Sequence, residues 1–359
     1  MSAQRPRRST RTPLMEFARR VALANAITLL FIAVALFVRT NFDALLLVFA
    51  GLLLAMLLYK LADVLARTLP LYRSFALVLV VFGMVGVAAV SIWLGAGPVG
   101  RQVDELLKVL PVAVESARDW INDRPALRGL LPNLPPAEQV PARLRLLLPE
   151  AGPFFTGAFG ALTNLVIVVF VGIYLAAQPR PYLRAMMALV PPRSRARAWH
   201  VLETLGNMLG RWLIGKAISM LIIGTVTSVS LYLLDIPLAL VLGLIAGLLN
   251  FIPYIGPIIA GVPAVLIAFS QSPADGGYTL VVFTMIHVLE GYLLIPLIER
   301  RTIALPPALT IVMQVLLGSM AGLTGAALAT PLTAVIVVLV AMLYVQDVLD
   351  VPVKPPGER

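Results

Sequence analysis

The chain has 359 residues, of which 60% are hydrophobic and only 13% are charged, and its mean hydropathy is +0.93. Soluble globular domains are about 45–50% apolar and about 25% charged, so the composition excludes an ordinary soluble enzyme and a disordered chain. The absence of cysteine excludes disulfides, thiolate metal sites and cysteine nucleophiles. In such an apolar chain, the net charge of +10 indicates cytoplasmic flanks of membrane helices rather than a nucleic-acid surface.

The first part of the chain predicts a basic arm followed by three membrane helices. Residues 1–20 are rich in arginine, and we expect them to form a cytoplasmic arm. Apolar runs follow at 21–38, 42–58 and 74–97, each close to the roughly 20 residues that one helical crossing needs. The first run is longer than the apolar core of a signal peptide, so we expect an uncleaved span. Residues 21–97 therefore predict three transmembrane helices.

A less apolar segment, residues 98–152, interrupts this pattern. Apolar residues such as Leu106, Leu110 and Val114 recur at helical spacing, and prolines punctuate the second half. Because its basic and acidic residues balance, the segment carries no signal for the cytoplasmic side. We expect a small helical extracytoplasmic segment that serves as a packing lid or a subunit contact.

Residues 153–349 predict a transport core. Runs of ordinary length occupy 153–177, 211–234 and 279–298. Two further runs, 237–269 and 309–345, are too long for one crossing and are interrupted by proline and glycine. The expected fold is an all-α polytopic membrane protein with about eight hydrophobic elements, two of them broken or re-entrant hairpins.

The distribution of lysine and arginine favours the hairpin interpretation. If each oversized run enters and leaves on one side, every short basic loop, including Arg300 and Arg301, lies on the cytoplasmic side. Both termini are then cytoplasmic, and residues 350–359 form a cytoplasmic tail. Paired broken segments that enter from opposite faces are a sequence indication of a transporter site.

Glu290 is the sharpest single candidate, because it lies near the middle of the run 279–298. A charge at that depth costs at least about 2.5–3.5 kcal/mol, so its presence needs a reason. Burial favours the protonated form of a carboxyl group, which suits a carrier of a proton or cation. His287 lies three residues earlier on the same helical face and is expected to tune it. The alternative is a structural hydrogen-bond anchor between helices.

The two breaks supply neutral polar groups and backbone groups to a solute. The substrate-binding candidates are Asn250, Pro253, Tyr254, Gly256, Pro257, Gln314, Ser319, Gly322 and Thr324. The alternative is kinked packing helices with small-residue contacts, since Gly243 and Gly247 also fit a helix-packing motif. Lys216, near the inner end of run 211–234, is expected to extend its side chain to the membrane surface.

No pattern of enzyme chemistry stands out. The stretch Gly210–Lys216 has P-loop spacing, but Ala217 replaces the magnesium-binding Ser/Thr and no strand precedes it. No metal-ligand spacing or nucleophile triad occurs. We therefore expect neither an enzyme nor a cofactor or metal.

The chain resembles a known family over nearly its whole length, with the most specific motifs in the last 110 residues. Asn250–Pro257, followed by Gly261 and Pro263, is similar to the signature of the autoinducer-2 exporter family of bacterial inner-membrane permeases. Later residues agree with that family's spacing: Glu290, Pro296, Arg301, Leu305, Pro307, Gly318, Gly322, Gly325, Pro331 and Leu332. The resemblance implies outward secondary transport coupled to an ion and a homo-oligomer. It also implies that Pro296, Arg301 and Pro307 belong to a gating loop.

These observations predict a permease of the bacterial inner membrane. Alternating access would take place between the hairpin tips and Glu290. We expect export of a small polar organic solute coupled to protons, with the lipid bilayer as the other partner. Two alternatives stay open: a sodium/proton antiporter, and a membrane scaffold without transport activity.

Overall fold

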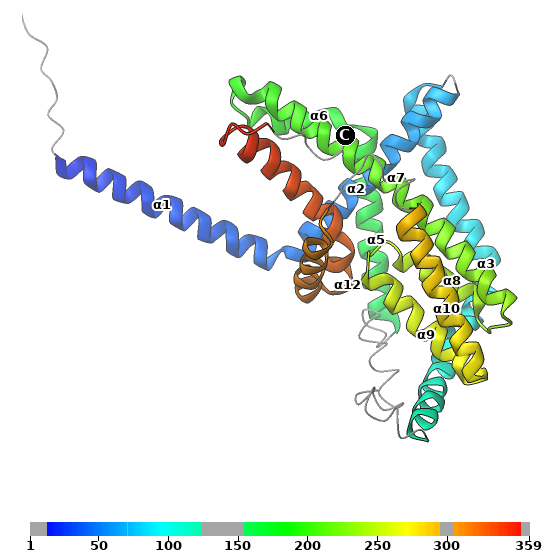
Figure 1. The fold of residues 1–359 in the computed structure, drawn as a ribbon. Coiled ribbons are helices and arrows are strands. Elements are labelled where there is room, and N and C mark those ends of the chain that lie inside the picture. Colours follow the sequence, from blue (N-terminus) through cyan, green and yellow to red (C-terminus); the bar gives the residue numbers. More distant parts are fainter. Residues whose placement is uncertain (1–12, 70, 124–153, 295–304, 353–359) are drawn as a thin grey trace, which may run out of the picture. The chain divides into compact units, whose positions relative to one another are not determined.

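The computed structural model describes residues 13–69, 71–123, 154–294 and 305–352 (Figure 1). These residues form helices joined by short turns, and none of them lies in a β-strand. The prediction of an all-α membrane protein is therefore confirmed for the described part of the chain. The chain divides into two units, residues 1–46 and residues 47–359.

The first unit contains helix α1 (Pro13–Thr40). Its stretch Val21–Thr40 has the length and hydropathy of a membrane span, and none of it is buried within the chain. Large apolar side chains such as Phe31 and Leu29 are exposed. This exposure is expected of a helix that is surrounded by lipid, because the hydrocarbon core is as apolar as the side chains themselves.

Helices α2 (Phe42–Thr68) and α5 (Phe154–Ala177) pack closely through small residues. A Cβ atom added to Gly51 would lie 2.7 Å from Val171 Cγ1, and one added to Gly172 would lie 2.9 Å from Leu54. Ala55, Leu58 and Ala176 form a buried apolar cluster between them. Small residues allow membrane helices to approach, since dispersion contacts replace the hydrophobic effect there.

Helix α3 (Arg73–Asn122) runs without interruption through the predicted boundary between the third span and the extracytoplasmic segment. At 1.5 Å per residue it is about 75 Å long, far more than the roughly 30 Å hydrocarbon core. Leu110 and Val114 are buried against helices α8 (Ala239–Leu249) and α9 (Ile255–Gln271). Trp120 lies edge-on to Phe269 with ring centroids 5.2 Å apart. The predicted helical periodicity therefore corresponds to an intramolecular packing surface.

A sharp bend separates α5 from the short helix α6 (Pro179–Ala188). Gln178 lies between them with φ −133° and ψ 67°. A residue before proline is pushed out of the helical region, so Pro179 ends α5 and begins a new helix. The two helix axes differ by 83°.

Helix α7 (Arg195–Leu233) follows the short 3-10 helix η2 (Pro192–Ser194), and its largest contact is with α8 (Ala239–Leu249). Gly224 of α7 meets Gly247 of α8, and Gly243 packs on Ser228. The predicted Gly243–Gly247 packing motif is therefore used for close approach of α8 to α7.

Replacing Gly247 by alanine is expected to force α7 and α8 apart. The added Cβ would lie 2.8 Å from Met220 O and 2.9 Å from Gly224 Cα, which are backbone atoms that cannot rotate away. Overpacking of this kind costs about 1–3 kcal/mol, so thermal unfolding of the purified protein should occur at lower temperature. Gly206→Ala in α7 is the control, because nothing lies within 4 Å of its added Cβ. Equal melting temperatures for both variants would contradict this packing.

The first oversized run forms two helices rather than one, α8 and α9 (Ile255–Gln271). They are joined at Asn250–Tyr254, where Tyr254 has φ 64°. Gly256 packs against the backbone of Leu249, and a side chain there would collide with the Leu249 carbonyl oxygen. Each helix is shorter than a membrane span, and α8 and α9 contact each other. The predicted break in this run therefore exists.

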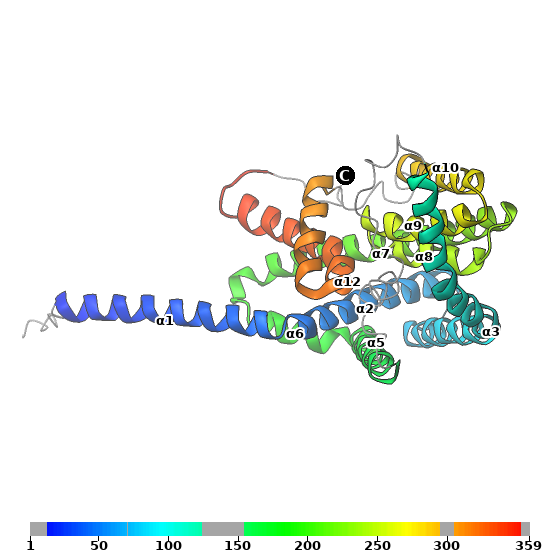
Figure 2. The ribbon, with the colours of Figure 1, turned by 90° about the horizontal axis from the view of Figure 1, so that it is seen from below.

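Helix α10 (Pro273–Leu289) packs alongside α9, and the two lie side by side in Figures 1 and 2. Ser272 caps its start by accepting a hydrogen bond from Asp275 N–H at 3.1 Å, and Pro273 occupies the first helical position. At its end, α10 continues into the π-helical turn η3 (Glu290–Leu294).

The second oversized run is helix α12 (Pro307–Leu339), continued by the π-helix η4 (Val340–Gln346). Ala321 and Gly322 leave the helical conformation, and the helix changes direction there in Figures 1 and 2. Gly322 has φ 57°, a conformation that glycine adopts without steric cost. The second predicted break therefore also exists.

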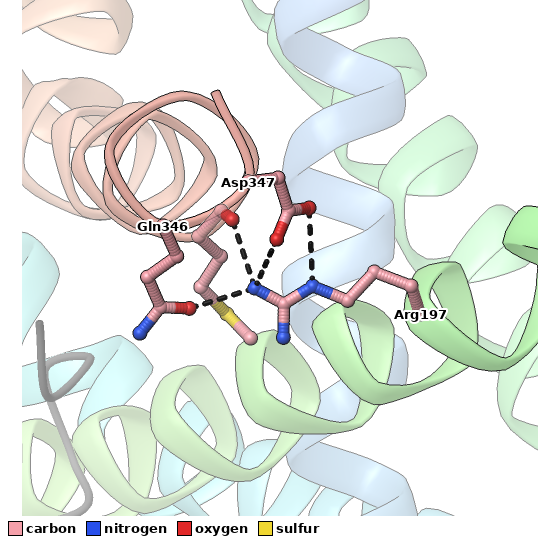
Figure 3. A network of polar contacts seen from close by, with 4 residues as sticks. Arg197, Gln346 and Asp347 are labelled. Atoms are coloured by element: carbon pink, nitrogen blue, oxygen red, sulfur yellow. Dashed lines mark hydrogen bonds and ion pairs between the residues drawn. The ribbon is translucent and has the colours of Figure 1, made fainter. Parts of the chain in front are cut away.

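A polar cluster ties the start of α7 to the end of η4 (Figure 3). The Arg197 guanidinium donates to Gln346 Oε1 at 2.7 Å and to Met342 O at 2.8 Å, and it lies 3.0 Å from Asp347 Oδ1. Bidentate contacts of this kind between arginine and a carboxylate add geometric specificity as well as binding energy. This cluster holds the last helical segment against α7.

The predicted count of about eight hydrophobic elements is not confirmed. Five described helices are long and apolar enough to cross a membrane, or six if the bent pair α5–α6 counts as one span. Three further apolar helices, among them α8 and α9, are shorter. Part of the difference arises because α8 and α9, which together make up one predicted element, are each shorter than a full crossing.

Candidate functional site

Glu290 is buried at the junction of α10 and η3, with 6% of its surface exposed. It is the first residue of the π-helical turn, in which each backbone hydrogen bond spans five residues instead of four. Such turns are rare and are frequent at functional sites. The sequence singled out Glu290 as an ion carrier or a structural anchor, and its role stays a prediction.

A chain of hydrogen bonds joins Glu290 to the break between α8 and α9. Ser219 of α7 donates its hydroxyl to Glu290 Oε1 at 2.9 Å. Asn250, the residue that ends α8, donates from Nδ2 to Ser219 Oγ at 2.9 Å. All three side chains are buried. A hydroxyl group can accept one hydrogen bond while it donates another, so Ser219 relays between the two partners.

Lys216 completes the site, and here the sequence prediction was wrong. Its side chain does not extend to the membrane surface, because only 5% of the residue is exposed and Nζ lies 3.9 Å from Glu290 Oε1. Lys216 precedes Ser219 by three residues and therefore shares the same face of α7. Lys216 and Ser219 are thus both directed at the buried Glu290 carboxylate.

The buried group of Lys216, Ser219, Asn250 and Glu290 is called here the Glu290 cluster. Lys216, Ser219 and Glu290 belong to helical segments that have the length and hydropathy of membrane spans. At 1.5 Å per residue, Ser219 is about 21 Å from the end of α7 at Leu233, and Glu290 is about 26 Å from the start of α10 at Pro273. These two helix ends lie close to each other, because Gln271 Nε2, just before α10, donates to Asp235 O, just after α7, at 3.4 Å. Both distances are shorter than the roughly 30 Å thickness of a hydrocarbon core.

The Glu290 cluster brings together residues from three elements, namely α7, the α8–α9 break and η3. A buried carboxylate needs a counter-charge and hydrogen-bond donors, and the cluster supplies both. Protonation of Glu290 would remove its attraction for Lys216 and weaken its acceptance from Ser219. Proton or cation binding at this carboxylate would thereby change the contact between α7 and η3.

His287 is close to Glu290 in sequence but is bonded elsewhere. Its Nδ1 lies 2.8 Å from Phe283 O, one turn earlier in α10, and its ring stacks on Phe283 with centroids 5.6 Å apart. The other ring nitrogen, Nε2, is buried without a hydrogen-bond partner among the described residues. The described contacts of His287 are therefore within α10, and its role in tuning Glu290 stays a prediction.

The other candidates at the first break surround the turn that carries Asn250. Pro253, Tyr254, Gly256 and Pro257 lie in or directly after it, and Tyr254 is exposed. Next to them, Phe251 lies edge-on to Trp212 of α7 with ring centroids 5.8 Å apart. Of the five substrate-binding candidates at this break, Asn250 is the one that the structure joins to Glu290, through its hydrogen bond to Ser219.

The candidates on α12 form a separate group. Gln314 is fully buried, and neither atom of its amide has a hydrogen-bond partner among the described residues. Ser319 donates to Leu316 O within its own helix, Gly322 forms the break, and Thr324 is exposed. No hydrogen bond or ion pair within the described ranges joins them to Glu290 or Asn250. Pro307 begins α12, whereas Pro296 and Arg301 lie outside the described residues.

Sequence reasoning missed Lys216 and Ser219 as members of the site. The available signal was a pair of polar residues three positions apart within the long helix that contains the run 211–234. An amine in one apolar helix and a carboxylate in another are a natural pair, because buried charges are rarely left alone. Only the contact between α7 and η3 reveals that they meet.

Comparison with known proteins agrees with this architecture. Residues 26–344 match the family described as "AI-2E family transporter". The chain belongs to this family. The resemblance noted from the sequence motifs is thereby confirmed, and the chain is a multi-pass membrane protein of a transporter family.

Named relatives of this AI-2E family member are also described as transport proteins. "Putative transport protein YueF" of Bacillus subtilis is 28% identical over 185 residues, which cover 50% of this chain and 50% of that protein. "Putative transport protein YrrI" of the same organism is 28% identical over 208 residues, covering 55% and 59%. A protein of Thermotoga maritima is 22% identical over 236 residues, covering 62% and 71%. The chain thus spans about half the length of the first two relatives.

Proposed function

We propose that this chain is a secondary transporter that exports a small polar organic solute in exchange for protons, with Glu290 as the proton carrier. The observation that carries the proposal is the burial of the Lys216–Glu290 pair between helical segments that have the length and hydropathy of membrane spans. Ionisable residues are rare there and mark ion and proton pathways. Membership of a transporter family supports the same function.

The proposed mechanism is alternating access with Glu290 as the switch. In the deprotonated state, Lys216 and Ser219 hold η3 against α7. Protonation removes the charge of Glu290, and the Asn250–Ser219 bond then remains the link to the α8–α9 break. The breaks at Asn250–Tyr254 and at Ala321–Gly322 are the places where the helices can rearrange, because they lack regular helical geometry.

A sodium/proton antiporter is the alternative that shares this site. It would bind sodium at Glu290 with Ser219 and Asn250 as further oxygen ligands. Lys216 argues against it, because an ammonium group 3.9 Å from the carboxylate repels a second cation. The third alternative, a membrane scaffold without transport, gives no reason for a buried ion pair.

We further propose that the protein lies in the bacterial inner membrane as a homo-oligomer, with both termini in the cytoplasm. The excess of arginine in residues 1–20 and after α5 supports this orientation. The short arms α8 and α9 are then a re-entrant hairpin that enters and leaves on the outer side.

Single-cysteine labelling tests the orientation, since the native chain contains no cysteine. Cysteine in place of the exposed Ala274, at the start of α10, is expected to react from outside intact cells with a membrane-impermeant maleimide. Cysteine in place of Ser194 should react only after the cells are opened. Reaction of both positions from the same side would mean that α8–α9 crosses the membrane.

The function itself is tested by flux measurements in proteoliposomes that contain a pH-sensitive dye. Gradients of sodium and of neutral polar organic solutes are imposed in turn, with protein-free vesicles as the control. Proton movement driven by one organic solute, and not by sodium, is expected. Movement driven by sodium alone would establish the antiporter, and absence of proton movement under every gradient would favour the scaffold.

A further inference from the structure

Helix α6 is a short element that the proposed transport site does not use. It leaves α5 at 83°, so it lies nearly perpendicular to a helix that has the hydropathy of a membrane span. None of its ten residues is buried. A helix that leaves a membrane span at a right angle lies along the membrane surface rather than across it.

The side of α6 that contacts the rest of the chain is narrow. Leu183 and Met187, one turn apart, are half-buried, and α6 contacts both α5 and α7. Val190, just after the helix, continues this line. The remaining sides of α6 face away from the described parts of the chain.

Of the remaining sides of α6, one is basic and the opposite one is apolar. With 100° per residue, Arg180 and Arg184 lie on one side of the helix, and both are exposed. Tyr182, Met186 and the following Leu189 lie on the opposite side, with 47%, 49% and 88% of their surface exposed. A helix with basic and apolar residues on opposite sides is the pattern of an element that lies in the membrane interface.

The positive charge of this region is not balanced locally. No acidic residue occurs from position 151 to position 202. Arg197 pairs with Asp347, but among the described residues no ion pair involves Arg180, Arg184 or Arg193. The basic side of α6 is therefore available for an anionic partner.

We propose that α6 is an anionic-lipid docking helix. Tyr182, Met186 and Leu189 enter the acyl boundary, while Arg180 and Arg184 bind the phosphate groups of anionic phospholipids. The apolar side decides for lipid over nucleic acid, because a nucleic acid would leave these three side chains in water. Continuity with α5 supports the same partner, since the preceding helix already has the composition of a membrane span.

The apolar half of the proposal is tested with a single fluorophore on the full-length chain in vesicles. An environment-sensitive dye is attached to cysteine in place of Met186, or in place of Ala188 as the matched control on the side nearer the arginines. The dye at Met186→Cys should be quenched by spin-labelled lipid and protected from iodide. The dye at Ala188→Cys should show the reverse. Iodide access at both positions would overturn the proposal.

The charged half is tested by comparing quenching of the Met186→Cys dye by spin-labelled phosphatidylglycerol and phosphatidylcholine with identical chains. Each arginine near an anionic surface is worth roughly a fivefold change in partition, so phosphatidylglycerol should quench several-fold more strongly. The double variant Arg180→Gln/Arg184→Gln should remove this preference. Lys108→Gln/Arg118→Gln, which removes two exposed charges from α3, should retain it. Equal quenching by the two lipids in the native background would overturn the proposal.

Discussion

Replacing Glu290 by glutamine is expected to reduce solute-driven proton flux to the rate of protein-free vesicles. Glutamine has nearly the same size and still accepts the hydrogen bond from Ser219, so the local contacts of η3 are kept. It cannot bind and release a proton, and it resembles the protonated carboxyl group. Exchange of labelled solute against unlabelled solute should therefore survive, because that exchange needs no proton release.

The matched control for this variant is Glu203→Gln. Glu203 lies on the same helix as Lys216 and Ser219 but is exposed, so its replacement should leave the proton flux unchanged. Each variant is first shown to be monodisperse in detergent, since Glu290→Gln leaves Lys216 without its counter-charge. Undiminished solute-driven proton flux through Glu290→Gln would remove Glu290 from the coupling mechanism.

Replacing Lys216 by methionine is expected to cause the largest loss of stability among substitutions at this site. Methionine fills a similar volume but leaves the Glu290 carboxylate buried without its cation. Breaking a buried ion pair by removing one partner costs about 3–5 kcal/mol. The midpoint of thermal unfolding in detergent should fall by several degrees, and Lys108→Met, at an exposed lysine of α3, should not change it.

The double variant Lys216→Met/Glu290→Gln distinguishes a broken ion pair from a simple packing defect. It removes both charges, and replacing a whole buried pair is often neutral for stability. We therefore expect the melting temperature to return close to that of the native chain while coupled flux stays absent. If the double variant is as unstable as Lys216→Met alone, or less stable, the two side chains do not compensate each other's charge.

The same two side chains illustrate how far sequence reasoning reaches for the site. Glu290 was found because a carboxylate inside an apolar run is conspicuous by itself. Lys216 was assigned to the membrane surface because a long basic side chain near the end of a run usually extends there. The structure instead places it beside Glu290, since the N-terminal part of α7 continues far beyond the apolar run.

The breaks in the two oversized runs also show what the sequence could and could not predict. Proline and glycine act on their own backbone and on adjacent residues, so the breaks near Asn250–Tyr254 and at Gly322 could be located from the sequence. Their side chains were predicted to meet around Glu290. In the structure Asn250 does so, while Gln314 is buried and no described hydrogen bond joins it to Glu290 or Asn250.

The sequence by itself determined the all-helical membrane class, the breaks in the two oversized runs, the family and the buried carboxylate. These are consequences of composition, hydrophobic run length and local backbone chemistry. The tertiary structure alone decided which residues surround Glu290. The packing of α7 against α8 and η3 decides which side of α7 meets Glu290, and that side carries Lys216 and Ser219. Pairing between residues over seventy positions apart depends on how whole helices pack, and a local motif such as Gly243–Gly247 marks a packing surface without naming its partner.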